Sequence, residues 1–121
     1  SRAQANAYAP YSDYRVGAAV MDSAGRIFGG CNVENASYGL SICAERSAIA
    51  AAVAAGLKPG ELSALLLLTG GDKPAVPCGA CLQVIAEFAA DDARVICTVE
   101  GGETRECLLE DLLPRRFRLL R

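Results

Sequence analysis

The sequence predicts an α/β fold in which helices cover both faces of a five-stranded mixed sheet, giving a three-layer α/β/α domain. Helical patterns alternate with short β-prone runs, and the last two runs flank a glycine turn typical of an antiparallel hairpin. The chain has 121 residues, of which 52% are hydrophobic, and this size and composition suit one compact core. We therefore expect a single domain over residues 1–121.

The first half of the chain predicts a helix, a hairpin and a second helix. Residues 1–8 are rich in alanine and precede Pro10, which favours a helix that stops before the proline. Residues 15–21 and 26–31 are apolar runs joined by a turn, so they predict an antiparallel hairpin. After a polar loop, residues 43–55 are mostly Ala, Ile and Val. This composition predicts a helix that is apolar on nearly all sides and therefore buried.

The second half predicts a central strand, a helix and the closing hairpin. Residues 62–69 form a leucine-rich run, which predicts a strand covered on both faces. Residues 78–90 have a helical pattern, and residues 94–99 and 104–107 flank Glu-Gly-Gly-Glu. Residues 108–113 predict a short helix that ends at a proline. The tail carries four arginines expected on a solvated or intersubunit face: Arg115, Arg116, Arg118 and Arg121.

The charge balance argues against a nucleic-acid partner. The chain has 12 Lys and Arg residues against 14 Asp and Glu residues, so it lacks the basic field that phosphate backbones require. A small uncharged substrate fits better. The apolar runs are too short or too rich in alanine to span a bilayer, and we expect no membrane partner. The chain opens at Ser1 without a secretory segment, which favours a cytoplasmic protein with a short N-terminal piece before this sequence.

Three cysteines and one glutamate carry the clearest chemical signal, in a chain without histidine. Cys43 stands two residues before Glu45, and Cys78 and Cys81 lie in the segment Pro-Cys-Gly-Ala-Cys. Three thiolates can bind one Zn²⁺ and leave its fourth position for water, which is typical of a catalytic zinc. A Cys-x-Glu motif followed by Pro-Cys-x-x-Cys is the signature of zinc-dependent nucleobase deaminases. We therefore expect one zinc ion per chain, with Glu45 as the acid and base beside it.

The other three cysteines have a simpler interpretation. Cys31, Cys97 and Cys107 lie in apolar, strand-like stretches, where cysteine packs as a small hydrophobic residue. The even count of six also permits a disulfide framework. Because no secretory segment is visible, buried thiols are the favoured interpretation.

Four motifs in order resemble those of the small homotetrameric cytidine deaminases. They are the segment at 9–19, which begins Ala-Pro-Tyr-Ser-Asp-Tyr-Arg-Val-Gly, the segment at 30–39, which begins Gly-Cys-Asn-Val-Glu-Asn, and the two cysteine motifs at 42–46 and 77–81. The resemblance implies a cytidine-deaminase-like fold and hydrolysis of cytidine and 2′-deoxycytidine in pyrimidine salvage. One departure is Leu82, because the family usually has arginine directly after the last cysteine. This change concerns packing or subunit contacts, and no metal ligand is lost.

The residues also predict the chemistry of such a site. Hydrolytic deamination of cytosine needs a nucleophile at C4, a proton at N3 and a proton on the departing amine. Zinc lowers the pKa of its bound water, while Glu45 can collect the released proton and pass it to N3 and then to the amine. The expected products are uridine and ammonia.

Three thiolates around Zn²⁺ leave a formal charge of −1, which opposes ionisation of the bound water. Cys43 begins one predicted helix and Cys78 another, so two helix N-termini bring partial positive charge to the sulfurs. Arg46 can donate hydrogen bonds to thiolates, and the resemblance implies that it does. An ordinary surface arginine is the alternative.

Substrate contacts depend more on the resemblance. Asn32 and Glu34 alternate on a loop, so both can face one ribose hydroxyl, and the family pattern implies contact with the 3′-OH. Free cytosine should then be a poor substrate. Plain turn formation is the alternative for both residues.

The base pocket is likewise inferred from the resemblance. It implies that Tyr14 lines the pyrimidine pocket and that Phe117 stacks on the base from a neighbouring subunit, although either aromatic could belong to the core. The backbone N–H of Ala44 and the carbonyl of Val76 are the expected contacts to the base edge. The resemblance thus implies a homotetramer with active sites shared between subunits.

Three other classes of function share parts of this pattern. A nucleic-acid deaminase has the same zinc and glutamate but needs a basic channel. A deaminase of an aminonucleoside antibiotic, such as blasticidin S, has similar motifs, although Asn-Val-Glu-Asn at 32–35 favours an ordinary nucleoside. A structural zinc module would need a fourth protein ligand near the cysteines.

Overall fold

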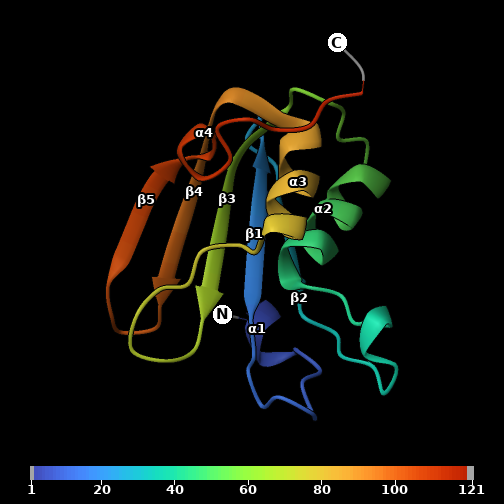
Figure 1. Ribbon diagram of the computed structural model, residues 1–121, viewed down its shortest axis with the longest axis vertical. Helices are drawn as coiled ribbons and strands as arrows, with labels where there is room; N and C mark the ends of the chain where they lie inside the picture. Colours follow the sequence, from blue (N-terminus) through green and yellow to red (C-terminus); the bar gives the residue numbers. More distant parts are fainter. Residues whose placement is uncertain (1, 120–121) are drawn as a thin grey trace.

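The computed structural model describes residues 2–119, in which five strands form one mixed sheet of order β2-β1-β3-β4-β5 (Figure 1). The strands are β1 (Gly17–Asp22), β2 (Ile27–Cys31), β3 (Leu62–Thr69), β4 (Ala89–Val99) and β5 (Thr104–Leu108). β3 and β4 are parallel, and every other neighbouring pair is antiparallel. The predicted mixed sheet, its central leucine strand and both hairpins are confirmed.

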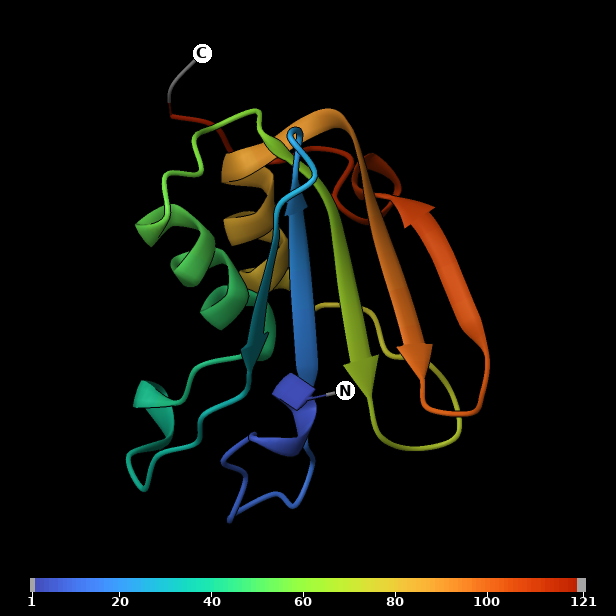
Figure 2. The same cartoon turned by 180° about the vertical axis from the view of Figure 1, so that it is seen from behind.

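Two helices, α2 (Ala44–Ala54) and α3 (Gly79–Phe88), cover one face of the sheet. The short α4 (Leu109–Leu112) packs beside them, because Leu109 belongs to the same buried core. The opposite face carries α1 (Arg2–Ala5), which lies over β1 and β2 in the view from behind (Figure 2). The third layer is therefore a single short helix in the described part of the chain.

The core lies between the sheet and the layer of α2 and α3. Alternate residues of β1, β3 and β4 point into it, and their partners on α2 and α3 are mostly alanine, leucine and isoleucine. Its completely buried side chains include Val20, Leu65, Ile85, Val95 and Leu109.

The predicted burial is wrong for two elements, β3 and α2. The thin third layer explains the exposure of β3. β3 is not covered on both faces, because Leu66 points away from the core and is 40% exposed. α2 is buried along one side only, through Ala48, Ile49 and Ala52, while Val53 is 41% exposed on its outer side. No other element of residues 2–119 covers that outer side.

The expected helix over 1–8 ends early, and the predicted part at Ser1 lies outside the described residues. The backbone leaves the helix because Tyr8 pairs with the loop after β2, donating to the Asn32 carbonyl at 3.0 Å and accepting from the Glu34 amide at 2.8 Å. In the second half of the chain, β4 begins at Ala89, directly after α3. The helix expected over 78–90 therefore ends earlier, and the strand expected over 94–99 begins earlier.

Gly30 on β2 allows α2 to approach the sheet closely. A Cβ atom at this position would lie 2.4 Å from the Ala48 backbone nitrogen and 2.8 Å from its Cα. The contact sets the position of α2, whose N-terminus carries Cys43.

The cysteines outside the predicted metal site are free thiols, like the other three. Cys97 is buried, and burial raises the pKa of its thiol to about 11. Cys31 and Cys107 are only half-buried, so the expected full burial is wrong for these two.

Two peripheral features complete the fold. Within residues 2–119, no helix combines the length and hydropathy needed to cross a bilayer. In the arginine tail, Arg115 and Arg118 are exposed, whereas Arg116 donates to the Ala86 carbonyl at 3.2 Å. Arg121 lies outside the described residues.

Candidate active site

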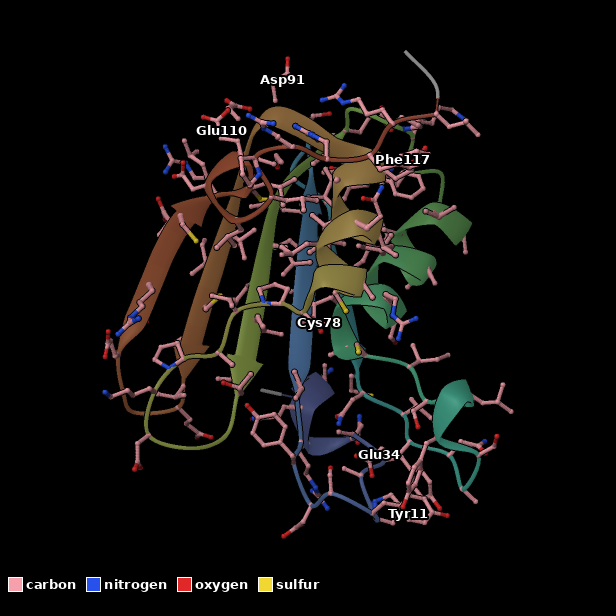
Figure 3. The ribbon with its side chains drawn as sticks, in the orientation of Figure 1. Tyr11, Glu34, Cys78, Asp91, Glu110 and Phe117 are labelled. Atoms are coloured by element: carbon pink, nitrogen blue, oxygen red, sulfur yellow. The ribbon has the colours of Figure 1, made fainter. Side chains whose placement is uncertain are left out.

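Three cysteines from two helices converge at one point. Cys43 is the N-cap of α2, Cys78 is the N-cap of α3, and Cys81 lies in the first turn of α3. Their sulfur atoms all lie within 4.8 Å of one another. Figure 3 shows Cys78 at the lower end of α3, beside the start of α2. The cluster forms because the two helices lie on the same sheet face with their N-termini together.

The donor set fits zinc. Thiolates are preferred ligands of Zn²⁺, and tetrahedral Zn–S bonds of about 2.3 Å imply sulfur separations of about 3.8 Å, which is compatible with three sulfur atoms that all lie within 4.8 Å of one another. Among the described residues, the cluster contains these three ligands and no fourth. It therefore leaves one position of a tetrahedral metal open.

The helix N-termini influence the thiols unequally. Hydrogen bonds from the backbone N–H of Cys81, from the Cys81 side chain and from the Ala80 backbone lower the pKa of Cys78. Burial, together with the neighbouring Glu45 charge and the other two cysteines, raises the pKa of Cys81. A cation bound to all three sulfurs would favour their thiolate forms.

Arg46 lies against the cluster. Its Nη2 donates to the Cys43 sulfur at 3.6 Å, and this hydrogen bond raises the pKa of the guanidinium. Arg46 Nε is buried without a hydrogen-bond partner in the described structure. Leu82, which replaces the family's usual arginine, is 7% exposed and packs into the hydrophobic core.

Glu45 lies in the first turn of α2 and is 5% exposed. It lines a cavity of about 230 Å³ together with Cys43 and Cys78. The helix N-terminus favours a carboxylate at this position. A buried carboxylate at the edge of a cluster of thiols, facing a cavity, can exchange protons with a ligand that enters.

The cavity brings together five residues that the sequence analysis assigned to catalysis or to substrate binding: Tyr14, Asn32, Ala44, Glu45 and Val76. Much of the remaining wall is apolar and comes from the segment before β1, from β3 and from the loop before α3. Such a wall suits a flat, weakly polar ring.

Asn32 connects two segments beside the cavity. Its Oδ1 accepts a hydrogen bond from the Val16 amide at 3.0 Å, and its Nδ2 donates to the Tyr14 carbonyl at 2.8 Å. The side chain thus holds the chain entering β1 against the loop leaving β2.

Glu34 lies just outside this cavity. Its carboxylate accepts hydrogen bonds from the backbone amides of Tyr11 at 2.9 Å and Ser12 at 3.1 Å, and from the Ser12 hydroxyl. These contacts, that from the Ser12 hydroxyl first, lower the pKa of Glu34. Glu34 and Tyr11 lie together near the bottom of Figure 3, lining a neighbouring hollow with Tyr38.

Phe117 lies away from the cavity of its own chain. It is 70% exposed and sits near the C-terminal end of the described chain, at the opposite end of α3 from Cys78 (Figure 3). The Gln83 side chain donates to the Phe117 carbonyl at 3.0 Å and holds the tail on α3.

Thr69 is a cavity residue that sequence reasoning missed. It is the last residue of β3, lines the cavity and is 3% exposed, and its hydroxyl is buried without a partner in the described structure. The only signal in the sequence was a hydroxyl residue that ends a run of leucines.

Comparisons with known proteins agree with this geometry. Residues 1–98 match the family model described as the cytidine and deoxycytidylate deaminase zinc-binding region. A cytidine deaminase from Sporosarcina psychrophila is 41% identical over 116 residues, which cover 96% of this chain and 84% of that protein. A cytidine deaminase from Mycobacterium tuberculosis is 41% identical over 119 residues, which cover 98% of this chain and 84% of that protein.

Solved structures give the same result. The crystal structure of cytidine deaminase from Burkholderia pseudomallei has a TM-score of 0.91 and 47% identity, with 96% of this chain and 91% of that chain covered. The cytidine deaminase structure from Mycobacterium tuberculosis has a TM-score of 0.82 and 40% identity, covering 98% of this chain and 90% of that chain.

Proposed function

The chain belongs to the cytidine and deoxycytidylate deaminase family, and from that premise we propose that it hydrolyses cytidine and 2′-deoxycytidine to the corresponding uridines and ammonia. The observation that carries the proposal is the convergence of three thiols and a buried glutamate at one end of an otherwise largely apolar cavity. A nucleoside base can enter such a cavity and meet both the metal ligands and the acid–base group.

Cys43, Cys78 and Cys81 would hold the zinc ion, whose Lewis acidity makes hydroxide available near neutral pH. Glu45 then moves the protons. It accepts the proton released as water adds to C4 and delivers it to N3 of the ring; it then accepts the proton of the new C4 hydroxyl and gives it to the amino group as the C4–N bond breaks. Water and cytidine are thereby converted to uridine and ammonia, with no proton gained or lost overall.

Positive groups of the chain offset the thiolate charge. Arg46 donates to Cys43, and the N-termini of α2 and α3 both face the sulfurs. We expect this arrangement to hold the three thiolates without a fourth protein ligand.

The cavity walls would recognise the nucleoside. Tyr14 and Val76, which line the cavity, would lie beside the base, and the Ala44 amide and the Val76 carbonyl would bind its polar edge. Asn32 would meet the ribose 3′-OH from the cavity wall, with Glu34 joining it from the neighbouring hollow. Since Glu34 is bonded to the loop at 11–12, this contact requires it to share its carboxylate between the loop and the sugar.

A homotetramer completes the proposal. Phe117 is 70% exposed and remote from its own cavity, which suits an aromatic side chain that enters the site of a neighbouring subunit. The outer side of α2, including Val53 at 41% exposure, offers apolar surface for subunit contact. Six free thiols, three of them metal ligands, suit a reducing compartment, so we place the protein in the cytoplasm and in pyrimidine salvage.

One assay tests the activity directly. Zinc-loaded protein is mixed with cytidine, and the fall in ultraviolet absorbance is followed together with ammonia release. We expect both signals at equal rates, with 2′-deoxycytidine also converted and free cytosine and blasticidin S converted poorly. Absence of ammonia release from cytidine and 2′-deoxycytidine by zinc-replete protein would refute the proposed function.

A further inference from the structure

Two buried polar side-chain atoms in residues 2–119 have no hydrogen-bond partner, and both lie at the candidate active site. Arg46 Nε belongs to the group of atoms around the cysteines. Thr69 Oγ1 is a buried atom of a residue that lines the cavity together with Glu45 and Val76. Thr69 is only 3% exposed, so water at the protein surface does not replace the missing partner.

The packing of the protein does not explain a hydroxyl at this position. A buried hydroxyl without a partner has lost its hydrogen bonds to water and gained none in return, which is unfavourable. Valine has nearly the same shape and lacks this cost. Neighbouring cavity residues such as Val16, Leu67 and Ala75 are apolar and would accommodate it.

The cavity contains few polar groups that can serve a ligand. The Asn32 amide bonds to Val16 and Tyr14 through both of its polar atoms, and its remaining hydrogen-bonding capacity is assigned to the ribose by the proposed function. The Thr69 hydroxyl, in contrast, can both donate and accept and can turn to suit its partner. It could therefore serve the amino group of cytosine and also the carbonyl group that replaces it in uracil.

We infer that Thr69 is a substrate-binding residue whose hydroxyl makes a hydrogen bond to the pyrimidine base in the cavity. The inference rests on the proposed function, because that function supplies the base. The hydroxyl is then satisfied in the complex and unsatisfied in the free protein, so it favours ligand binding at the expense of the stability of the empty protein.

The test compares Thr69→Val, which removes the hydroxyl at constant shape, with Thr69→Ser, which keeps it. All proteins are zinc-loaded, and the affinity for uridine is measured by calorimetry beside kcat/KM for cytidine. We expect Thr69→Val to weaken uridine binding and lower kcat/KM by roughly tenfold each, about the effect of one lost hydrogen bond. Thr69→Ser should recover at least half of each loss on a logarithmic scale. The melting temperature of ligand-free Thr69→Val should equal or exceed that of the wild type.

Three results would overturn the inference. Wild-type uridine affinity and kcat/KM in Thr69→Val would show that the base does not use the hydroxyl. A lower melting temperature of ligand-free Thr69→Val would show a partner within the protein. Equal losses in the serine and valine variants would show that a hydroxyl at this position does not restore binding, so the base would not depend on it. A wild-type protein inactive on cytidine would refute the proposed function separately, and the uridine titration would still decide whether Thr69 binds a pyrimidine.

Discussion

The proposed function gives Glu45 and the three cysteines separate tasks, because Glu45 lies beside the sulfur cluster without belonging to it. We expect Glu45→Ala to retain about one zinc per chain and to lose roughly 10²- to 10⁴-fold in kcat, the usual range for a positioned acid–base group. Elemental analysis and the absorbance assay on the same sample check both points. Near-normal turnover in this variant would contradict the assigned role.

The variant to compare with Glu45→Ala is one that removes a candidate metal ligand. Cys43→Ala takes one of three thiolates from the cluster, so zinc content, melting temperature and activity should fall together. If Glu45→Ala were as poor in zinc as Cys43→Ala, the division between proton transfer and metal binding would be wrong.

Glu34 supports a loop, and the proposed function also assigns it to the substrate. Its contacts with Tyr11 and Ser12 hold the loop before β1 in place and lower its pKa below the ordinary value of 4.5. A carboxylate whose pKa is lower in the folded state stabilises the protein above the unfolded-state pKa. This stabilisation is lost as the pH falls through the folded-state value.

We therefore expect Glu34→Gln to be less stable than the wild type at pH 7, with the difference shrinking as the pH falls below about 4.5. Denaturant unfolding at a series of pH values measures this convergence. Glu87→Gln is the control, because Glu87 is exposed and its carboxylate forms no hydrogen bond or ion pair with the described residues. A constant difference between Glu34→Gln and the wild type at all pH values would contradict the prediction.

At the scale of elements, the site depends on how closely α2 approaches the sheet. Gly30 permits this approach, since any side chain there would collide with the backbone of Ala48. Backbone atoms cannot move aside as a flexible side chain can. A shift of α2 would also carry Cys43 and Glu45 away from α3.

We expect Gly30→Ala to lower the free energy of unfolding by about 1–3 kcal/mol, the usual cost of overpacking, and to lower zinc affinity as well. Chemical denaturation and competition with a chelator measure the two effects. Gly39→Ala is the control from the segment between β2 and α2, because a Cβ at Gly39 would meet no atom within 4 Å. Wild-type stability and zinc affinity in Gly30→Ala would show that α2 does not need this close contact.

At the scale of the whole molecule, Phe117 is exposed and far from the cavity of its own chain. The proposed function assigns it to the cavity of a neighbouring subunit. Phe117→Ala should therefore raise KM for cytidine without changing zinc content, and removal of residues 115–121 should do the same. Leu119→Ala is the control, because Leu119 is 82% exposed in the same tail. Equal effects of Phe117→Ala and Leu119→Ala would remove the special role of Phe117.

Hybrid oligomers test whether Phe117 acts across subunits. Glu45→Ala chains keep Phe117 and Phe117→Ala chains keep Glu45, so a mixed assembly contains some sites with both residues intact. We expect coexpressed chains to be more active at low cytidine concentration than the average of the two parents. A fully active monomer in light scattering would contradict the tetramer and the shared site together.

The sequence by itself determined the element order and the candidate metal ligands. Leu62–Thr69 is recognisable as a central strand because a run of leucines between turns has few other stable placements. Cys43 and Cys78 are recognisable as ligands because their spacing from Glu45 and Cys81 is local and the helix that follows each can be predicted from composition.

Only the tertiary structure decided which faces stay exposed and which polar groups meet. Leu66 and Val53 are as apolar as their buried neighbours, and their exposure depends on which elements cover them. α1 is shorter than expected because Tyr8 pairs with a loop that is distant in sequence. Thr69 is the last residue of a strand, which is an ordinary position for threonine. The role inferred for it depends on the cavity formed by β3, α2 and the loop before α3. Such contacts join residues far apart in the chain, so no local pattern records them.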